Sequence, residues 1–320
     1  MKHCPITYQP IDEKETYSAE GPKKIAPALK GLRPFPYSAE EQRKEARLRA
    51  GKMSIQGIQP KLSANINIKE MVFEIVDRGG RFILKPQTLD YAELPENEDV
   101  TMRLAAVAGI ETPFHGLMVS ADRSYTYFIR RMDRFGHVGK LPLEDFAQLS
   151  QKSRETKYNS SMEQVAEVIE THCSFPLIDK AKLFFRTLFS FLVGNEDMHL
   201  KNFSLLSREG IHSLSPAYDL VNSTLALENA REELALPLNG KKNNLNAKDL
   251  LVYFPRERLG LNRKVIDQTV ERFKKSLPLW GDLLENCFLS GSRKDKYRQL
   301  IEARCQRLGL PAYPNLASKS

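Results

Sequence analysis

The stretch from Phe191 to Leu220 constrains the fold of this chain more than any other segment. An apolar run, Thr187–Val193, ends at Gly194, and a cluster of polar residues follows it. A helix that stops at a polar loop can place oxygen ligands at the edge of a cleft. The next residues, NFSLL, SREG and IHSLSP, predict a short β-hairpin that delivers Asp219 to the same region. The polar cluster consists of Asn195, Glu196, Asp197, His199, Lys201 and Asn202.

Asp197 and Asn202 are five residues apart, the spacing of the aspartate and asparagine in the catalytic loop of protein kinases. In those enzymes the aspartate accepts the proton of the substrate hydroxyl, and the asparagine binds magnesium together with a later aspartate. Asp219 is the candidate for that later acid. The spacing also fits an ordinary loop, because Asp and Asn cap turns. The interpretation therefore depends on further signals upstream.

Length and composition leave room for a full hydrophobic core. The chain has 320 residues, enough for one large domain or two modest ones, and its apolar content of 41% and charged content of 28% are typical of soluble globular proteins. No apolar run approaches the roughly 20 residues that span a bilayer. The N-terminus lacks the apolar core of a signal peptide. We therefore expect a cytoplasmic protein with no membrane contact.

The four cysteines show no paired spacing of the C-x-x-C kind, so we expect reduced thiols rather than a metal site. They are Cys4, Cys173, Cys287 and Cys305. The net charge of +8 permits contact with nucleic acid or with an acidic protein. The Lys and Arg residues are scattered along the chain, however, and no nucleic-acid motif accompanies them. We expect them to form solvated helix faces.

The first part of the chain predicts a β-rich lobe. Residues 1–36 show little periodicity and read as an extended arm. Ser38 and Glu41 have the spacing of a capping box, which predicts a helix from there to near Gly51. A further helix is expected at 98–108, with Glu98 in its first turn. Strands are expected at 62–68, 71–76, 81–85, 116–119 and 124–132, with 71–76 and 81–85 forming a hairpin and 116–119 and 124–132 another.

Two features of this part could contact phosphate groups. Residues 54–61 form a small polar segment with Gly57, whose backbone N–H groups could face phosphates. With one glycine, the segment also fits an ordinary loop. Lys85 closes an apolar strand, where a lysine commonly reaches solvent. It also matches the position of the ATP-contacting lysine of kinases, with Glu98 placed to pair with it.

The second part predicts mainly helices. They are expected at 141–151, 161–173, 177–194, 246–254, 263–277, 280–288 and 294–309, with a hairpin at 233–244. A small β-rich lobe at residues 1–135, followed by a larger helical lobe at residues 136–320, indicates an α+β, bilobal protein-kinase-like fold. The segment 129–133 would link the lobes.

Taken in order, these motifs resemble the HipA-type serine/threonine kinases of bacterial toxin–antitoxin systems. The resemblance covers roughly residues 35–310. It is most specific in two blocks, D-x-H-x-K-N-F-S at Asp197–Ser204 and P-x-Y-D at Pro216–Asp219. The supporting matches are S-x-x-G-x-Q-x-K from Ser54 to Lys61, the L-K-P strand end at Lys85, N-E at Asn97 and Glu98, and M-D-R-F at Met132–Phe135.

The resemblance implies a cytoplasmic kinase that uses ATP and Mg²⁺. It assigns Asp197 as general base or orienter of the target hydroxyl, and Asn202 and Asp219 as magnesium ligands. Lys201 would neutralise charge on the transferred phosphoryl group. His199 would either brace the loop or act directly. The expected nucleotide contacts are Ser54, Ile55, Gln56, Gly57, Ile58, Gln59, Lys61, Lys85, Glu98, Arg130, Arg131, Met132, His199, Asn202 and Asp219.

The resemblance also implies regulation and partners. Relatives autophosphorylate at the position of Ser54, and a phosphate there would repel the ATP phosphates. About 50 residues precede the loop, which resembles the short HipT toxins that work with separate HipS and HipB proteins. DNA contact would then be indirect, through a HipB-like partner. The target implied is an aminoacyl-tRNA synthetase, tryptophanyl- by analogy.

Two other functions stay open at this point. One is a small-molecule phosphotransferase, because lipid and antibiotic kinases share the same lobe plan. The other is a non-catalytic binding module that keeps the fold and joins a repressor complex. The presence of Lys85, Asp197, Asn202 and Asp219 together argues against the second alternative, because kinase folds that have lost catalysis usually lack one of them.

Overall fold

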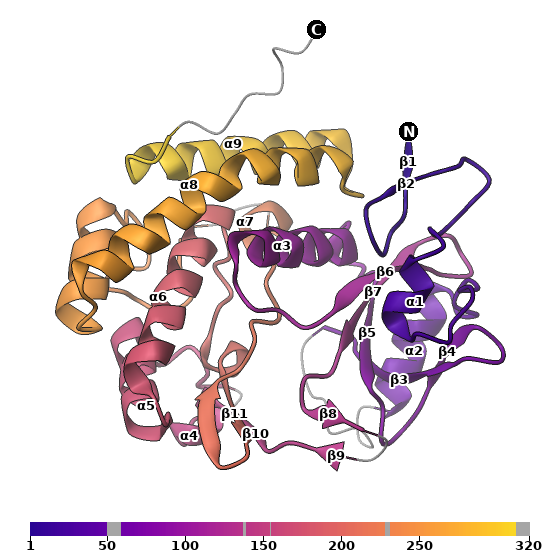
Figure 1. The fold of residues 1–320 in the computed structure, drawn as a ribbon, viewed down its shortest axis with the longest axis horizontal. Helices are drawn as coiled ribbons and strands as arrows, with labels where there is room; N and C mark the ends of the chain where they lie inside the picture. The colour runs from indigo at the N-terminus through magenta and orange to yellow at the C-terminus, as the bar shows by residue number, and fades with distance from the viewer. Residues whose placement is uncertain (50–58, 137–138, 154, 228–230, 312–320) are drawn as a thin grey trace, which may run out of the picture. The chain divides into compact units, whose positions relative to one another are not determined.

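The computed structural model describes residues 1–49, 59–136, 139–153, 155–227 and 231–311 (Figure 1). The chain divides into two compact units that interleave in sequence. The boundary predicted at residue 135 stays a prediction. Unit 1 comprises Met1–Val100, Pro113–Val138 and Asn286–Leu289, and unit 2 comprises Thr101–Thr112, Gly139–Glu285 and Ser290–Ser320.

Unit 1 is built on an antiparallel sheet with strand order β4-β3-β5-β7-β6. The five strands expected in this part of the chain are therefore confirmed. Its elements are β1 (Lys2–His3), β2 (Pro10–Ile11), α1 (Gly21–Ile25), α2 (Ala39–Arg49), β3 (Leu62–Asn67), β4 (Val72–Ile75), β5 (Phe82–Pro86), the start of α3 (Leu94–Ala108), β6 (His115–Val119), β7 (Tyr125–Arg130) and β8 (Arg134–Phe135).

One predicted strand pairing is wrong. β4 and β5 do not form a hairpin, because β3 lies between them in the sheet. The connection after β4 instead passes close over β3: a Cβ atom on Gly80 would lie 2.0 Å from Ser63 Oγ. Gly80 therefore permits a close backbone approach, and Gly79 adopts the left-handed conformation with φ of 72°, but the DRGG segment does not make a hairpin turn. The hairpin of β6 and β7 is confirmed.

The N-terminal residues do not form only an extended arm, because several of them pack in the core of unit 1. Cys4, Ile6 and Leu29 are buried in the core of unit 1, where they pack with sheet residues that include Phe73 and Phe128. Burial of such side chains removes apolar surface from water, which stabilises the unit. Several side chains of residues 1–36 thus belong to the hydrophobic core of unit 1. Most of these residues lie outside regular elements, as expected.

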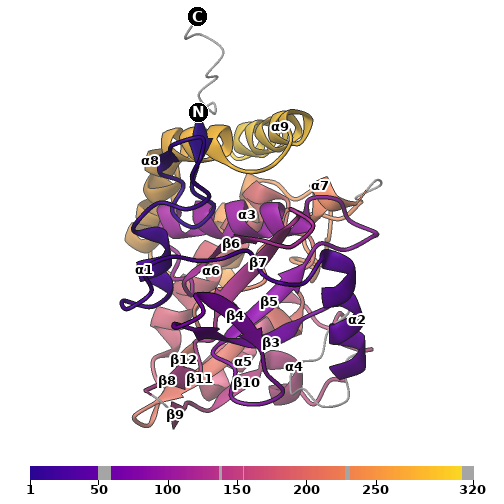
Figure 2. The same ribbon diagram turned by 90° about the vertical axis from the view of Figure 1, so that its right-hand side faces the viewer.

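The helix α2 lies beside β3 and β5 (Figure 2). Its predicted capping box is confirmed: Glu41 N–H donates to Ser38 Oγ at 3.2 Å, and Ser38 N–H donates to Glu41 Oε2 at 2.7 Å. The expected end of this helix near Gly51 lies outside the described residues. The helix α3 begins at Leu94 rather than near residue 98, so Glu98 lies in its second turn and not in its first.

Unit 2 is mainly helical, with a three-stranded sheet of order β10-β11-β12. The predicted hairpin after the polar cluster is confirmed as β11 and β12. Its elements after α3 are β9 (Gly139–Lys140), β10 (Leu143–Asp145), α4 (Phe146–Leu149), α5 (Met162–His172), α6 (Pro176–Val193), η1 (Leu200–Asn202), β11 (Ser204–Arg208), β12 (Ile211–Leu214), α7 (Ser223–Ala226), η2 (Lys248–Arg258), α8 (Arg263–Asn286) and α9 (Gly291–Arg307).

Three predictions for unit 2 need correction. Residues 141–151 are a strand and a short helix, since Asp145 forms a capping box with Gln148 and so fixes the helix start. Residues 233–244 form an isolated bridge, Leu238 with Lys241, in place of a hairpin. Residues 263–286 form the single helix α8, which continues through Pro278. Burial of the next turn keeps α8 together, because the fully buried Trp280 packs on α6.

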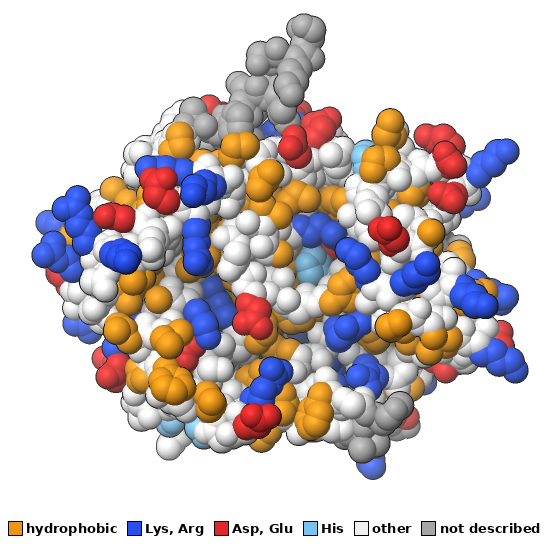
Figure 3. Space-filling model, in the orientation of Figure 1, with side chains coloured by type: hydrophobic (Ala, Val, Ile, Leu, Met, Phe, Trp, Pro, Cys, Tyr) orange, Lys and Arg blue, Asp and Glu red, His pale blue; other side chains and the backbone are white. Residues whose placement is uncertain are grey.

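All four cysteines are buried and free. In the part of the chain that the structure describes, no helix is both long and apolar enough to cross a membrane. Figure 3 shows Lys and Arg side chains spread over the visible face, with fewer Asp and Glu side chains among them.

Candidate active site

The polar cluster begins where α6 ends. Gly194 closes the helix in the left-handed conformation, with φ of 70°. A Cβ there would lie 2.4 Å from Leu300 Cδ2 and 2.8 Å from Thr224 Oγ1, so both the backbone and the space require glycine. The chain can therefore turn sharply from the buried helix into the loop 195–203, which we name the catalytic loop for its predicted role.

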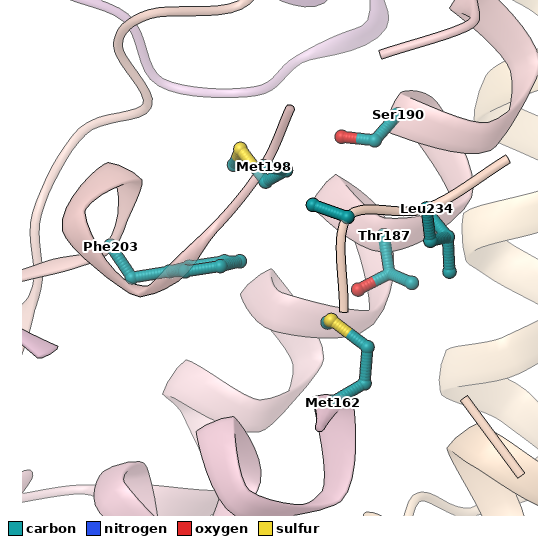
Figure 4. A pocket seen from close by; sticks show the side chains of 7 residues that line it. Met162, Thr187, Ser190, Met198, Phe203 and Leu234 are labelled. Atoms are coloured by element: carbon teal, nitrogen blue, oxygen red, sulfur yellow. The ribbon is translucent and has the colours of Figure 1, made fainter. Parts of the chain in front are cut away.

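Apolar side chains anchor the rear of the catalytic loop. Met198, Leu200 and Phe203 are buried and alternate with the polar residues. Figure 4 shows Met198 and Phe203 facing α6 across a cavity of about 10 Å³, which is room for about one water molecule. The cavity is too small for a substrate. Its lining residues are Met162, Thr187, Ser190, Met198, Phe203, Leu234 and Ala235.

A buried acid ties the start of the loop to the following segment. Glu196 accepts hydrogen bonds from Thr224 Oγ1 at 3.2 Å and from the N–H of Glu232 at 3.0 Å. Its own N–H donates to Ser223 Oγ at 2.7 Å. Burial raises the pKa of the Glu196 carboxyl, although the two bonds it accepts oppose that rise. These contacts fix the backbone immediately before Asp197.

Asn202 is oriented by the loop itself. Its Nδ2 donates to the carbonyl of Asp197 at 2.9 Å, which leaves the amide oxygen at the opposite end of the side chain. The half-buried Asp197 accepts from Tyr158 Oη at 2.5 Å through Oδ1. The predicted base and the predicted metal ligand thus lie on one tight turn.

Asp219 is joined to this turn through its neighbour. The hydroxyl of Tyr218 donates to the carbonyl of Lys201 at 3.0 Å and lies 2.5 Å from Ser204 Oγ. Asp219 itself has φ of 55°, a left-handed conformation that costs a non-glycine residue about 1–3 kcal/mol and concentrates at functional sites. The bonds of Tyr218 therefore join the segment that carries Asp219 to the catalytic loop.

Lys201 and His199 have different surroundings. Lys201 is about one-third exposed, and its Nζ lies 3.6 Å from Asp145 Oδ2. His199 is buried, and its Nε2 lies 2.6 Å from Lys157 Nζ. Burial lowers the pKa of His199, the ammonium of Lys157 acts in the same direction, and the carboxylate of Asp197 opposes both. The lowered pKa favours the neutral imidazole, whose Nε2 can accept a hydrogen bond from the ammonium of Lys157.

In unit 1, the expected pair of Lys85 with Glu98 is present. The two side chains are each 3% exposed, and Lys85 Nζ lies 2.5 Å from Glu98 Oε1. The next residue of α3, Asp99, pairs with Nδ1 of His115 on β6 at 2.9 Å. Glu98 and Asp99 of α3 thus pair with residues on two different strands, β5 and β6. Lys85 also lies 5.5 Å from the ring centroid of Tyr127.

The other residues predicted to contact the nucleotide differ in whether the structure describes them and in how buried they are. Ser54, Ile55, Gln56, Gly57 and Ile58 lie outside the described residues. Gln59 is half-buried, and its Nε2 has no hydrogen-bond partner within the described ranges. Lys61 and Met132 are half-buried.

Two arginines of the predicted link bond within unit 1. Arg130 donates to the carbonyl oxygens of Lys24 and Ile25 at 3.0 and 2.6 Å, and its guanidinium packs on aromatic rings. Arg131 holds Asp133 in a bidentate pair at 2.9 Å. Both guanidinium groups are thus already engaged in unit 1.

The donor set of unit 2 fits a hard cation. Asn202 and Asp219 offer one amide and one carboxylate oxygen, and Mg²⁺ usually takes one or two protein ligands together with substrate phosphates and water. Across the described parts of the chain, no cluster of three or more His, Cys, Asp or Glu side chains could hold a metal.

Several residues of the site were not anticipated from the sequence. Tyr158 and Lys157 lie in a polar loop without a motif, so no sequence signal pointed to them. Tyr218 belongs to the P-x-Y-D motif, but the sequence did not predict that its hydroxyl links to the catalytic loop. Asp145 was placed inside a helix, whereas it caps α4 and approaches Lys201.

Comparison with known proteins identifies relatives of this chain. A family model described as the HipA-like C-terminal domain matches residues 53–280. A putative kinase of Haemophilus influenzae is 30% identical over 84% of this chain and 86% of the relative. The serine/threonine-protein kinase toxin HipA of Shewanella oneidensis is 26% identical over 71% of this chain and 56% of the toxin.

Two solved structures share the fold. A chain from the complex of HipA, HipB and operator DNA of Shewanella oneidensis matches with a TM-score of 0.69 and 22% identity, over 88% of this chain and 74% of that one. The proinflammatory kinase CtkA of Helicobacter pylori matches with a TM-score of 0.59 and 16% identity, over 81% and 91%. The fold is kinase-like, and the chain belongs to the HipA-like C-terminal domain family.

Proposed function

We propose that this chain is a serine/threonine protein kinase that acts as a toxin of a bacterial toxin–antitoxin system. The observation that supports this most is the catalytic loop, on which Asn202 is bonded to the carbonyl of Asp197 while Tyr218 joins Asp219 to the same loop. Kinase-named relatives support the general activity. The toxin role and the target are inferences from the family.

Each residue has a role in this proposal. Asp197 orients the acceptor hydroxyl and takes its proton, and Lys201 offsets negative charge on the transferred group. Lys85, oriented by Glu98, contacts ATP phosphates. Asn202 and Asp219 would hold Mg²⁺, which bridges and neutralises the phosphate oxygens when bound. The neutral His199 braces the catalytic loop.

Regulation and partners form the second part of the proposal. Phosphorylation of Ser54 would place about −1.5 to −2 charges beside the ATP phosphates and lower the nucleotide affinity. HipB-like and HipS-like antitoxins would bind the chain, with DNA reached only through the HipB-like protein. The relative from Shewanella oneidensis was solved with HipB and operator DNA, which supports the HipB-like partner. The proposed target is tryptophanyl-tRNA synthetase, whose phosphorylation would stop tRNA charging and translation.

The test begins with the purified, dephosphorylated chain incubated with Mg·ATP, followed by intact mass measurement and peptide mapping. We expect one phosphate on Ser54, and none in Asp197→Gln. Adding purified tryptophanyl-tRNA synthetase should give a phosphorylated synthetase that no longer charges tRNA, while glutamyl-tRNA synthetase serves as the comparison. Failure of wild-type protein to transfer phosphate to itself or to either synthetase would refute the protein kinase proposal.

A further inference from the structure

A loop between α4 and α5 lies on the catalytic loop of unit 2, where no motif predicted a contact. Three bonds join them. Tyr158 Oη donates to Asp197 Oδ1 at 2.5 Å, Lys157 Nζ lies 2.6 Å from His199 Nε2, and the N–H of Leu200 donates to the carbonyl of Lys157 at 3.3 Å. Two adjacent side chains therefore reach two polar residues of the catalytic loop.

The bond to Asp197 has the form of a substrate contact. A kinase acceptor is a hydroxyl that donates to the catalytic aspartate, and the phenol of Tyr158 donates to Asp197 in the same way. A hydroxyl within hydrogen-bond distance of one carboxylate oxygen occupies the space that an acceptor oxygen needs there. The tyrosine and an acceptor hydroxyl thus compete for Oδ1 of Asp197.

The surroundings of Tyr158 allow it to leave. Tyr158 is 38% exposed, so part of its surface already faces solvent. The loop is also held on its other side by Lys157, whose ammonium lies 4.9 Å from the Tyr158 ring centroid. The ring of Tyr158 packs edge-on against His199, with the centroids 5.0 Å apart. Release of the phenol gives up these two ring contacts, while the bonds from Lys157 to His199 and Leu200 can keep the loop attached.

We propose that Tyr158 is a gate on the acceptor side: its hydroxyl occupies the acceptor position on Asp197, and a protein substrate must displace it before transfer. This rests on the proposed kinase function. The fraction of chains in which Asp197 is not bonded to Tyr158 then sets the apparent affinity for the acceptor, because the apparent Kd equals the intrinsic Kd divided by that competent fraction. The gate favours protein acceptors that also bind other surfaces of this chain. It disfavours free serine, which offers only its hydroxyl.

The kinetic test uses Tyr158→Phe, which removes the hydroxyl and keeps the ring. With tryptophanyl-tRNA synthetase as acceptor, we expect the acceptor KM to fall by about fivefold or more, because a hydrogen bond to a charged group is lost from the closed form. The KM for ATP should stay unchanged. Tyr253→Phe is the matched control, since Tyr253 Oη donates to Glu163 at 3.2 Å, away from the catalytic loop residues.

A second readout does not require activity. Chain labelled with 3-fluorotyrosine gives a ¹⁹F resonance for Tyr158, assigned by its loss in Tyr158→Phe. Asp197→Asn should shift this resonance and leave that of Tyr253 in place. An unmoved resonance would overturn the placement of Tyr158, and an unchanged acceptor KM in Tyr158→Phe would overturn the gate. Phosphate found on Tyr158 would also overturn it, because the residue would then be an acceptor itself.

The two readouts separate the gate from the proposed function. A shifted Tyr158 resonance in a chain that transfers no phosphate counts against the kinase proposal and supports the position of the tyrosine. Normal transfer with an unmoved resonance leaves the kinase proposal standing and removes the gate alone.

Discussion

Removing Lys85 should destabilise the chain far more than a typical surface change, because its partner would stay buried. Lys85 and Glu98 are each 3% exposed and 2.5 Å apart. Breaking such a pair by removing one member leaves an uncompensated charge in the interior, which costs about 3–5 kcal/mol. We therefore expect Lys85→Met to lower the free energy of unfolding by that amount and to abolish phosphotransfer.

The double variant separates stability from catalysis. In Lys85→Met/Glu98→Leu both charges are replaced by apolar groups of similar size, a change that is often neutral or stabilising. We expect it to recover the stability to within about 1–2 kcal/mol of wild type and to stay inactive. Urea unfolding followed by far-UV circular dichroism measures the free energies by linear extrapolation.

An exposed pair provides the control. Lys44 and Glu40 on α2 are 2.8 Å apart, with side chains 64% and 68% exposed. Water screens such a pair, so Lys44→Met should leave the urea midpoint unchanged. Two results would refute the reasoning about the buried pair: a Lys85→Met variant as stable as the control, or a double variant no more stable than Lys85→Met.

Three further predictions concern the catalytic loop. Tyr218→Phe should cost about 1–3 kcal/mol of stability and reduce the kcat of phosphotransfer, because it leaves the oxygens bonded by the phenol unpaired; urea unfolding and steady-state kinetics measure the two effects. Gly194→Ala should destabilise the chain by more than the about 1–3 kcal/mol of backbone strain that Gly210→Ala incurs, since only at Gly194 would the Cβ meet Leu300. Burial lowers the pKa of His199, so the unfolded chain binds this proton first and stability should fall as the pH drops below about 6.5. The His199→Gln variant should flatten that part of the profile of urea midpoint against pH.

The sequence was most informative where local chemistry decides the structure. The capping box at Ser38, the stop of α6 at Gly194 and the hairpin of β11 and β12 depend on neighbours within a few residues, and all three were predicted correctly. The Lys85–Glu98 pair was found because a strand end and a helix have a known relation in kinase folds. The chemical roles of these residues stay predictions.

Errors arose where packing overrides local preference. A proline normally ends a helix, and a break was therefore expected near Pro278, but the buried Trp280 keeps α8 continuous. The DRGG segment has the composition of a hairpin turn, yet Gly80 lies against Ser63 and the chain continues past β3. Periodicity alone could not reveal that a third strand lies between two consecutive ones.

The catalytic loop shows why the residue that controls access need not carry a motif. Glu196 and Asn202 bond backbone groups, and Tyr218 bonds the carbonyl of Lys201, so each of these contacts is part of the folded loop. The bond from Tyr158 to Asp197 differs, because its donor is 38% exposed and lies on a separate loop. It can break while the rest of the loop stays in place. In the proposed gate, access of an acceptor to Asp197 depends on this bond, which sequence spacing does not encode.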